Sequence, residues 1–189
     1  DLFKVWEDLG SIECVLEDIV PFRREISIMY FKSQDGSEGF FPISENYHLD
    51  GILRKSLAPI ELENSKEIEL KSHIKQFAKN LNFYGIIAIE LFEHIDGQYI
   101  FNEIAPRPHN SFHWTIEGCE NNQFDILVRT ICGLPVKDVT CQDKWEMTNI
   151  IGEDINDLIP IYSEQDYSIN IYGKKTVKPG RKMGHYSKR

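Results

Sequence analysis

Two apolar segments joined by a turn sequence place the strongest constraint on how this chain folds. Ile86–Phe92 and Tyr99–Ile104 have the composition of neighbouring strands, and Asp96-Gly97 between them is a common two-residue hairpin turn. In such a hairpin, residues equally far from the turn face each other, which pairs Glu90 with Glu103. The sequence therefore predicts an antiparallel sheet that carries two facing carboxylates.

These facing glutamates indicate a cation site. Like charges directly opposite each other destabilise a sheet, and Glu90 lies in an apolar strand, where desolvation adds to the cost. The pair must share a proton or hold a cation, and oxygen ligands completed by phosphate suit Mg²⁺. The alternative is two glutamates on a solvated face, which the apolar neighbours of Glu90 oppose.

The second strand of the hairpin leads into a segment dense in polar groups. Phe101–Thr115, FNEIAPRPHNSFHWT, combines a carboxylate, a guanidinium and two imidazoles with two prolines that disfavour helix. Polar groups converging on a stiff loop are typical of a binding site, although a purely structural loop is the alternative. His109 and His113 have the spacing of a zinc-protease motif, but Asn110 replaces its glutamate, so zinc is not expected.

Periodicity and turn signals predict the remaining elements. Strands are expected at Cys14–Leu16, Glu25–Phe31, Gly39–Ser44, Met147–Ile151 and Ser168–Tyr172, and helices at Ser65–Asn82 and Asn122–Cys132. The polar segment Glu45–Leu53 is expected to be a loop. An antiparallel sheet flanked by helices, here expected on one side, is an α+β plan. The pattern changes near residue 136, which divides the chain into residues 1–135 and a small β-rich C-terminal domain, 136–189.

Composition sets limits on the class of protein. The 189 residues, 41% of them hydrophobic, can bury about 70% of the unfolded surface in one core. No apolar run approaches the ~18 residues of a membrane span, and there is no cleavable signal pattern, so no membrane partner is expected. The four cysteines lack metal-ligand spacing, which favours reduced thiols and a cytoplasmic location. Asp1 in place of an initiator methionine fits a portion of a longer protein.

Charge is distributed unevenly along the chain. The net charge is −9, yet residues 174–189 hold seven Lys or Arg and no acid. An acidic body opposes a general nucleic-acid surface but allows a local phosphate site. A solvated basic tail is the alternative, although Pro179–His185, PGRKMGH, displays its cations on a backbone restricted by glycine and proline.

Four segments together resemble a known family. They are VLEDIVPFRREIS, ENYHLDGILRKSLAP, NEIAPRPHNSFHWT and YGKKTVKPGRKMGH, in this order along almost the whole chain. With the glutamate pair they resemble the 5-(carboxyamino)imidazole ribonucleotide synthases, which are ATP-grasp enzymes. The resemblance implies the C-terminal part of an ATP-grasp fold, with ATP and Mg²⁺ as cofactors. It further implies carboxylation of aminoimidazole ribonucleotide with bicarbonate, through carboxyphosphate, in de novo purine biosynthesis, by a homodimer.

The resemblance also implies roles for individual residues. Glu17 and the backbone through Val20 match groups that lie near adenine in the family. Glu25 matches the acid that binds the ribose, and His48 lies in a segment that matches a loop near the polyphosphate. Glu90 and Glu103 match magnesium ligands, in agreement with the hairpin argument. The remaining matched residues are Asn102 beside the cofactor, Arg107 and His109 in catalysis, and Asn110, Ser111, Lys174, Arg181 and Lys182 for the substrate.

The chain also departs from the family pattern. Phe112 stands where the family has glycine, so its ring narrows the site or packs outward. The family's N-terminal substrate domain, and the lysine and glycine-rich loop that cover the phosphates, are absent from these residues. We therefore expect a fragment that is inactive alone.

Two alternatives to this function remain open. A ligase of the formate-dependent glycinamide ribonucleotide transformylase type is one, but there an Asp-Thr pair follows the histidine, where this chain has Asn110-Ser111. A non-catalytic nucleotide-binding module is the other.

Overall fold

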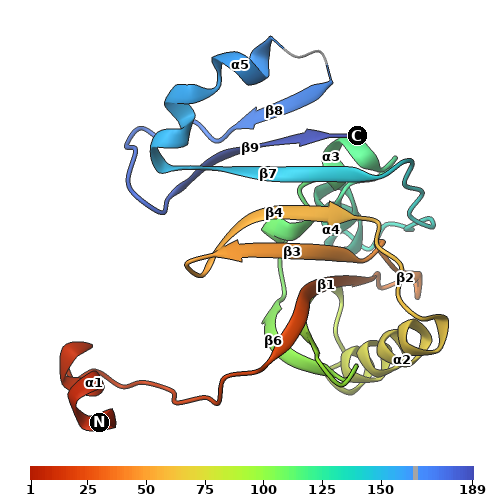
Figure 1. Ribbon diagram of the computed structural model, residues 1–189. Helices are drawn as coiled ribbons and strands as arrows, with labels where there is room; N and C mark the ends of the chain where they lie inside the picture. The colour runs from red at the N-terminus through yellow and green to blue at the C-terminus, as the bar shows by residue number, and fades with distance from the viewer. Residues whose placement is uncertain (164–165) are drawn as a thin grey trace.

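One antiparallel sheet forms the body of the protein. The computed structural model describes residues 1–163 and 166–189, and among these residues nine strands pair in the order β6-β5-β1-β3-β4-β7-β9-β8, with β2 beside β1 (Figure 1). The strands are β1 Phe22–Lys32, β2 Glu38–Phe40, β3 Ser44–Leu49, β4 Ile52–Ala58, β5 Gly85–His94, β6 Tyr99–Ala105, β7 Trp145–Ile151, β8 Tyr167–Ile171 and β9 Lys182–Lys188. This confirms the α+β class that the sequence predicts.

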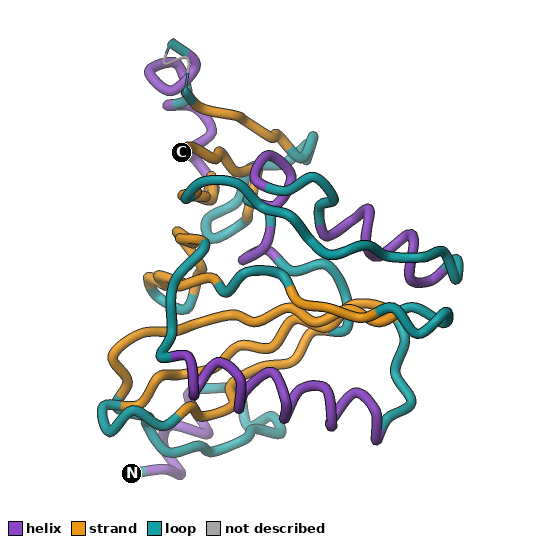
Figure 2. The backbone as a smooth tube through the Cα atoms, turned by 90° about the vertical axis from the view of Figure 1, so that its right-hand side faces the viewer, coloured by secondary structure: helices purple, strands orange, loops and turns teal. Residues whose placement is uncertain are grey.

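Helices cover both faces of the sheet, so the expectation of helices on one side only is wrong. The helical elements are α1 Leu2–Asp8, α2 Asn64–Asn80, α3 Thr115–Gly118, α4 Gln123–Ile131, α5 Ile159–Tyr162, and the 3₁₀ turns η1 Asn110–Phe112 and η2 Gly152–Asp157. Figure 2 shows α2 and α4 on opposite sides of the strands. Both long helices agree with the predicted ones to within two residues at each end.

Alternation along the central strands explains the two covered faces. Ile26, Ile28 and Tyr30 of β1 pack in one cluster with α2, whereas Met29 and Phe31 pack in another cluster that includes α4. Because both faces of β1 are buried, its sequence is a nearly continuous apolar run. The sequence therefore does not indicate which residues face α2 and which face α4. The polar exception in this run is Ser27, which is fully buried.

Two of the expected elements are wrong and a third is only partly right. Of the predicted strand Gly39–Ser44, residues 41–43 lie between β2 and β3 and belong to neither. The predicted loop Glu45–Leu53 is the β3–β4 hairpin, in which Leu49 pairs with Ile52. Its turn is Asp50-Gly51, where both residues have positive φ (52° and 72°), as a tight two-residue hairpin requires. The predicted strand Cys14–Leu16 is exposed coil in the structure, because β-forming side chains make a strand only beside a partner strand.

The hairpin between β5 and β6 has the predicted pairing but a different turn. The backbone N–H of His94 donates to the carbonyl of Gln98 (2.8 Å), so residues 95–97 form a three-residue loop. That loop pairs Leu91 with Phe101. A bulge at Asn102 then shifts the register by one residue and pairs Glu90 with Glu103. The facing glutamates are thus confirmed, although the two-residue turn is wrong.

The C-terminal strands continue the same sheet. Residues of β4 pair with β7, for example Lys55 with Thr148, and a small cluster of Ile150, Leu158 and Met183 packs beyond them. Within the basic segment near the C-terminus, Lys182–Lys188 form β9, whereas residues 175–180 are an exposed loop. The division near residue 136 stays a prediction, since the sheet runs on across it.

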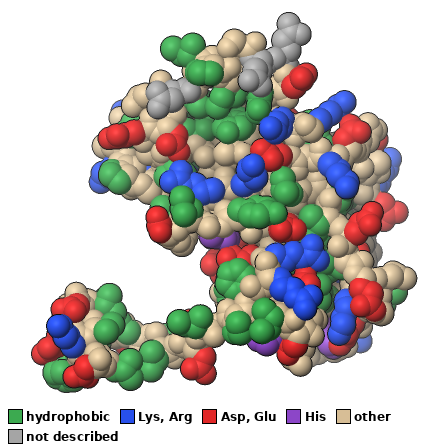
Figure 3. Space-filling view, viewed as in Figure 1, with side chains coloured by type: hydrophobic (Ala, Val, Ile, Leu, Met, Phe, Trp, Pro, Cys, Tyr) green, Lys and Arg blue, Asp and Glu red, His purple; other side chains and the backbone are tan. Residues whose placement is uncertain are grey.

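The N-terminal segment lies away from the sheet. Residues 1–19 are exposed, and the chain runs from α1 as an extended arm to β1 (Figures 1 and 3). Figure 3 shows apolar side chains along this arm; among them Val15 is 86% exposed and Ile19 is 95% exposed. Exposed apolar side chains in such number indicate a surface that contacts another protein part.

The cysteines differ from expectation. Cys119 and Cys141 form a disulfide, whereas Cys14 and Cys132 are free and exposed. Sequence spacing does not reveal this pair, because the two residues are brought together only by the fold around α4. None of the helices in the described part of the chain is long and apolar enough to cross a membrane.

Candidate functional site

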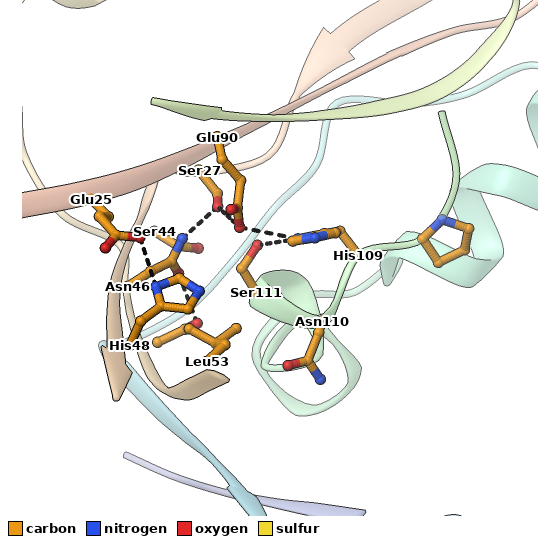
Figure 4. A network of polar contacts seen from close by, with 12 residues as sticks. Glu25, Ser27, Ser44, Asn46, His48, Leu53, Glu90, His109, Asn110 and Ser111 are labelled. Atoms are coloured by element: carbon orange, nitrogen blue, oxygen red, sulfur yellow. Dashed lines mark hydrogen bonds and ion pairs between the residues drawn. The ribbon is translucent and has the colours of Figure 1, made fainter. Parts of the chain in front are cut away.

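The polar side chains that the sequence singles out meet on one face of the sheet. Figure 4 shows Glu25 and Ser27 from β1, His48 from β3 and Glu90 from β5 facing the segment that carries His109. This is the face that η1 and α3 cover.

Glu90 is the buried carboxylate of the site. Its side chain is almost fully buried, Ser27 Oγ donates to its Oε1 at 3.4 Å, and His109 Nδ1 lies 3.6 Å from the same oxygen. Burial raises the pKa of Glu90, and the carboxylates of Glu103 and Glu25 raise it further, while His48 opposes them. A cation beside these carboxylates would remove much of that cost.

A chain of buried hydrogen bonds holds the floor of the site. Asn46 Nδ2 donates to Ser27 Oγ (2.6 Å), and Ser56 Oγ donates to Asn46 Oδ1 (2.9 Å). Trp114, which is fully buried, donates from Nε1 to Ser44 Oγ at 2.9 Å. Sequence reasoning missed Ser27, Asn46 and Ser56. For Ser27 the available signal was a polar residue inside the apolar run of β1.

His48 and Glu25 form an ion pair. His48 Nδ1 lies 2.6 Å from Glu25 Oε2. Hydrogen bonding to Glu25 is the largest effect on His48 and raises its pKa against the opposing effect of burial. The two residues predicted to serve ribose and polyphosphate are therefore in direct contact.

Gln123, at the first position of α4, fixes the backbone of the loop. The His109 N–H donates to Gln123 Oε1 (2.8 Å), and Gln123 Nε2 donates to the His109 carbonyl (3.0 Å). The same Nε2 lies 2.9 Å from His113 Nδ1. Gln123 is fully buried, and sequence reasoning missed it because a glutamine at a helix start is an ordinary residue.

His109 is held as a neutral imidazole. Burial lowers its pKa to about 4, helped by the nearby Arg107 and Lys182. Its Nδ1 lies 2.8 Å from Ser111 Oγ, which itself is fully buried. At pH 7 the ring is therefore uncharged and can accept a hydrogen bond.

Asn110 connects the loop to the C-terminal strands. Its amide and that of Asn149 in β7 donate to each other, with Asn110 Nδ2 2.9 Å from Asn149 Oδ1. Asn149 Nδ2 also donates to the Leu53 carbonyl at 2.9 Å. Sequence reasoning missed Asn149.

Of the three basic residues predicted for the substrate, Lys182 is the one whose pKa is affected by the glutamate pair. Burial lowers its pKa, while Glu90 and Glu103 raise it and Arg107 and Lys174 lower it. Lys174 Nζ donates to the carbonyl of Lys182, whereas Arg181 donates to the Thr176 carbonyl at 2.9 Å. Lys174 and Lys182 thus lie together, and Arg181 contacts the exposed loop before β9.

The other predicted residues lie at the surface. Glu17 is exposed and Val20 half-buried, both in the N-terminal arm between α1 and β1. Asn102 at the bulge, Glu103 and Arg107 are exposed, and Arg107 donates to the Pro108 carbonyl at 3.0 Å. A ligand bound over the sheet could reach the last three.

Phe112 packs into the core and does not narrow the site. Its ring is fully buried and meets Phe41 edge-on at 6.1 Å. The sequence leaves open whether the Phe112 ring narrows the site or packs away from it, and the structure shows that the ring packs away.

The donor set fits a magnesium ion that is shared with a phosphate ligand. Within the described residues, no group of three or more His, Cys, Asp or Glu could hold a metal alone. Glu90 and Glu103 offer hard oxygens from facing strand positions. Because Mg²⁺ is usually bound by one or two carboxylates plus phosphates and water, this pair suffices.

The sequence matches two protein families. Residues 1–124 match the ATP-grasp domain, and residues 146–187 match the phosphoribosylaminoimidazole carboxylase C-terminal domain. The N5-carboxyaminoimidazole ribonucleotide synthase of Bacillus subtilis is 37% identical over 174 residues, which cover 91% of this chain and 46% of the relative.

Solved structures show the same likeness. An ADP complex of N5-carboxyaminoimidazole ribonucleotide synthetase has a TM-score of 0.91 and 34% identity, covering 99% of this chain and 50% of that one. The Aspergillus clavatus enzyme, in complex with ADP and 5-aminoimidazole ribonucleotide, has a TM-score of 0.82 and 29% identity, covering 98% and 52%. This chain spans about half the length of these relatives. Since the ATP-grasp model matches well over half of its residues, the chain belongs to the ATP-grasp family, and the relatives it matches there are N5-carboxyaminoimidazole ribonucleotide synthases.

Proposed function

We propose that these residues form the nucleotide- and substrate-binding floor of an enzyme that carboxylates aminoimidazole ribonucleotide with bicarbonate at the expense of ATP, in purine biosynthesis. The observation that carries the proposal is the buried Glu90 carboxylate facing Glu103, with His109 Nδ1 3.6 Å from it. The names and bound ligands of the similar proteins support it.

ATP and Mg²⁺ are the cofactors of this proposal. Glu90 and Glu103 would hold the ion, which when bound neutralises charge on the transferred phosphoryl group. His48, which lies 2.6 Å from Glu25 and whose pKa Glu25 raises, would face the polyphosphate, and Glu25 has a second oxygen for the ribose. We assign the adenine contacts to Glu17 and Val20, with Asn102 near the cofactor.

The reacting groups are assigned to the loop before α3. Arg107 presents a guanidinium that can hold an oxyanion such as bicarbonate or the departing phosphate. Neutral His109 would accept a hydrogen bond from the substrate amine and hold it in position for attack, with Ser111 Oγ beside its Nδ1 to orient the ring. Asn110 would contact the substrate from its anchored position beside Asn149.

The basic residues near the C-terminus complete the proposed substrate site. Lys174 and Lys182 lie together, and Arg181 is on the adjoining loop, so a ribonucleotide phosphate could bind among them. Assembly as a homodimer and a cytoplasmic location remain predictions from the resemblance and the composition.

Two other functions are weighed against this one. The formate-dependent transformylase type is opposed by Asn110-Ser111, the pair that differs between the two families. A non-catalytic module loses its main support, because Phe112 packs into the core away from Glu90.

The test is phosphate release by the complete gene product that contains these residues. We expect turnover only with ATP, Mg²⁺, bicarbonate and aminoimidazole ribonucleotide together, and none when any of the four is omitted. Turnover with formate and glycinamide ribonucleotide would favour the first alternative, and nucleotide binding without turnover the second.

The 189-residue chain by itself provides a second check. Phosphoryl transfer needs charge neutralisation around the phosphates, and the family's lysine and glycine-rich loop are absent from these residues. We expect at most weak Mg-ATP binding and no substrate-dependent phosphate release. Turnover above about 1 per second would show that the reaction does not need the family's lysine and glycine-rich loop, and would contradict the proposal.

A further inference from the structure

The disulfide between Cys119 and Cys141 lies behind the candidate site. Cys119 directly follows α3, Cys141 precedes β7, and the 22-residue separation encloses the whole of α4. Neither cysteine takes part in the proposed reaction.

The backbone itself brings the two cysteines together. The Glu120 N–H donates to the Thr140 carbonyl, and the Gln142 N–H donates to the Gly118 carbonyl, both at 3.0 Å. These bonds flank the antiparallel bridge between Cys119 and Cys141, whose Cα atoms are 4.1 Å apart. Such a flanked pair is the close, non-hydrogen-bonded type, in which side chains on the same face lie nearest. The two thiols would therefore face each other in the reduced protein as well.

A small reagent can approach this pair. Both cysteines are half-buried, and Cys119 lines a cavity of about 210 Å³ whose other lining residues include Glu120, Thr140 and Arg189. Glu120 and Arg189 are exposed, so the cavity opens at the surface. The pair is therefore unlike a core disulfide that solvent does not reach.

The enclosed helix connects the disulfide to the candidate site. α4 begins with Gln123, whose side chain accepts from and donates to the backbone of His109 and lies 2.9 Å from His113 Nδ1. A change in how firmly α4 is held is thus transmitted by direct hydrogen bonds to the loop that carries His109.

We propose that Cys119 and Cys141 form a reversible thiol–disulfide exchange site for small disulfides, and that closing the bond stabilises α4 together with the loop that Gln123 holds. One cysteine thiolate attacks a sulfur of the small disulfide, forming a mixed disulfide and releasing one thiol. The second cysteine then attacks the protein-bound sulfur, closes the Cys119–Cys141 bond and releases the second thiol. Two electrons pass from the protein thiols to the small disulfide, which leaves as two thiols.

The closed form should be the more stable one. A cross-link over this many residues restricts the unfolded chain, which for a protein of this size corresponds to a melting temperature higher by about 5–10 °C. The difference should depend on this pair alone and not on Cys14 or Cys132, which are free and exposed.

The experiment compares two matched double variants of the 189-residue chain. In C14S/C132S only the proposed pair remains, and in C119S/C141S only the exposed cysteines remain. Each protein is reduced, freed of reductant and equilibrated in buffers of varied ratio of glutathione to glutathione disulfide. Free thiols are then alkylated and counted by mass spectrometry. We expect C14S/C132S to pass between two free thiols and none, with a melting temperature that follows this transition, and C119S/C141S to show no intramolecular bond.

Hydrogen–deuterium exchange tests the effect on the site. In the closed form of C14S/C132S, exchange should be slower in α4 and in residues 106–114 than in the open form, and unchanged in α2, which packs on the other face of the sheet. Thiols that stay free, or that stop at the mixed disulfide with glutathione, would overturn the exchange site. A bond that native protein does not release in excess glutathione would overturn its reversibility, and equal exchange in both forms would overturn the coupling.

Discussion

Burial of the Glu90 carboxylate has opposite consequences for stability and for chemistry. Its pKa is raised above the unfolded value, so the ionised group opposes folding once the pH exceeds the unfolded pKa. The same unfavourable charge is what a bound cation would neutralise.

Substitution of Glu90 separates the two consequences. Glu90→Gln in the complete gene product should lower kcat by at least about 100-fold, since a charge that acts on the transferred phosphoryl group is lost. The free energy of unfolding of the 189-residue chain at pH 7 should not fall, because the penalty for the buried charge is removed. Glu69→Gln, on the exposed side of α2, is the matched control and should change neither quantity. Unchanged turnover of Glu90→Gln would contradict a role in holding the ion.

Phe112 allows a test of where its ring packs. Phe112→Ala should lower the free energy of unfolding in urea by about 3–5 kcal/mol, as expected for a fully buried phenylalanine. Phe101→Ala is the control, because that ring is 58% exposed, and should cost less than about 1 kcal/mol. Similar losses for the two variants would show that Phe112 is not in the core.

Among the elements, α4 does more than cover the sheet, because its first turn supplies Gln123. Asn122 caps this helix by accepting from the N–H groups of Phe124 and Asp125, and Asp125 in turn accepts from the Asn122 N–H. A firm helix start is therefore also a firm support for the loop at His109.

Removing this cap should loosen both helix and loop. Asn122→Ala should cost about 1 kcal/mol of stability in urea denaturation, and Asn122→Ser, which retains a capping oxygen, only a fraction of that. Amide exchange should rise in residues 108–113 as well as in α4 for the alanine variant. A rise confined to α4 would contradict the mechanical link through Gln123.

For the molecule as a whole, the response to acid depends on buried histidines. Burial lowers the pKa of His109 and of His185 to about 4 and that of His113 to about 3. The unfolded state therefore binds more protons between these values and the unfolded pKa near 6.5, so stability is present at neutral pH and is lost as the pH falls. His48, Glu90 and Glu117 have raised pKa values. These three groups therefore have the opposite effect and make the protein more stable as the pH falls.

A histidine variant should make this acid response shallower. Between pH 7 and pH 5 each buried neutral histidine contributes on the order of 1–2 kcal/mol to the loss of stability. We expect His185→Gln to reduce the fall in melting temperature over this range, even if the variant is less stable at pH 7. His73→Gln, exposed on α2, should leave the slope unchanged. If the melting temperature falls equally steeply with pH in wild type and in His185→Gln, a contribution of buried His185 to the acid response would be contradicted.

Local patterns in the sequence were sufficient for several features of the protein. Both long helices, the strands β1, β5 and β6 and the facing glutamates follow from periodicity and turn residues, because these signals depend on near neighbours in the chain. The motifs in the loop and near the C-terminus likewise indicated the family. The hairpin argument reached the right pair although the turn differs, since the bulge at Asn102 offsets a three-residue loop.

Contacts between distant segments were decided only by the tertiary structure. The His48–Glu25 ion pair, the bonds of Gln123 to the loop, the Asn110–Asn149 pair and the Cys119–Cys141 bridge each join residues whose mutual distance no local pattern encodes. The inward packing of Phe112 belongs to the same group, because a ring beside a polar loop can turn either way until the sheet and α4 leave it one place. Periodicity reports which side of a strand or helix is apolar, and only the packing of all the elements determines what that side meets.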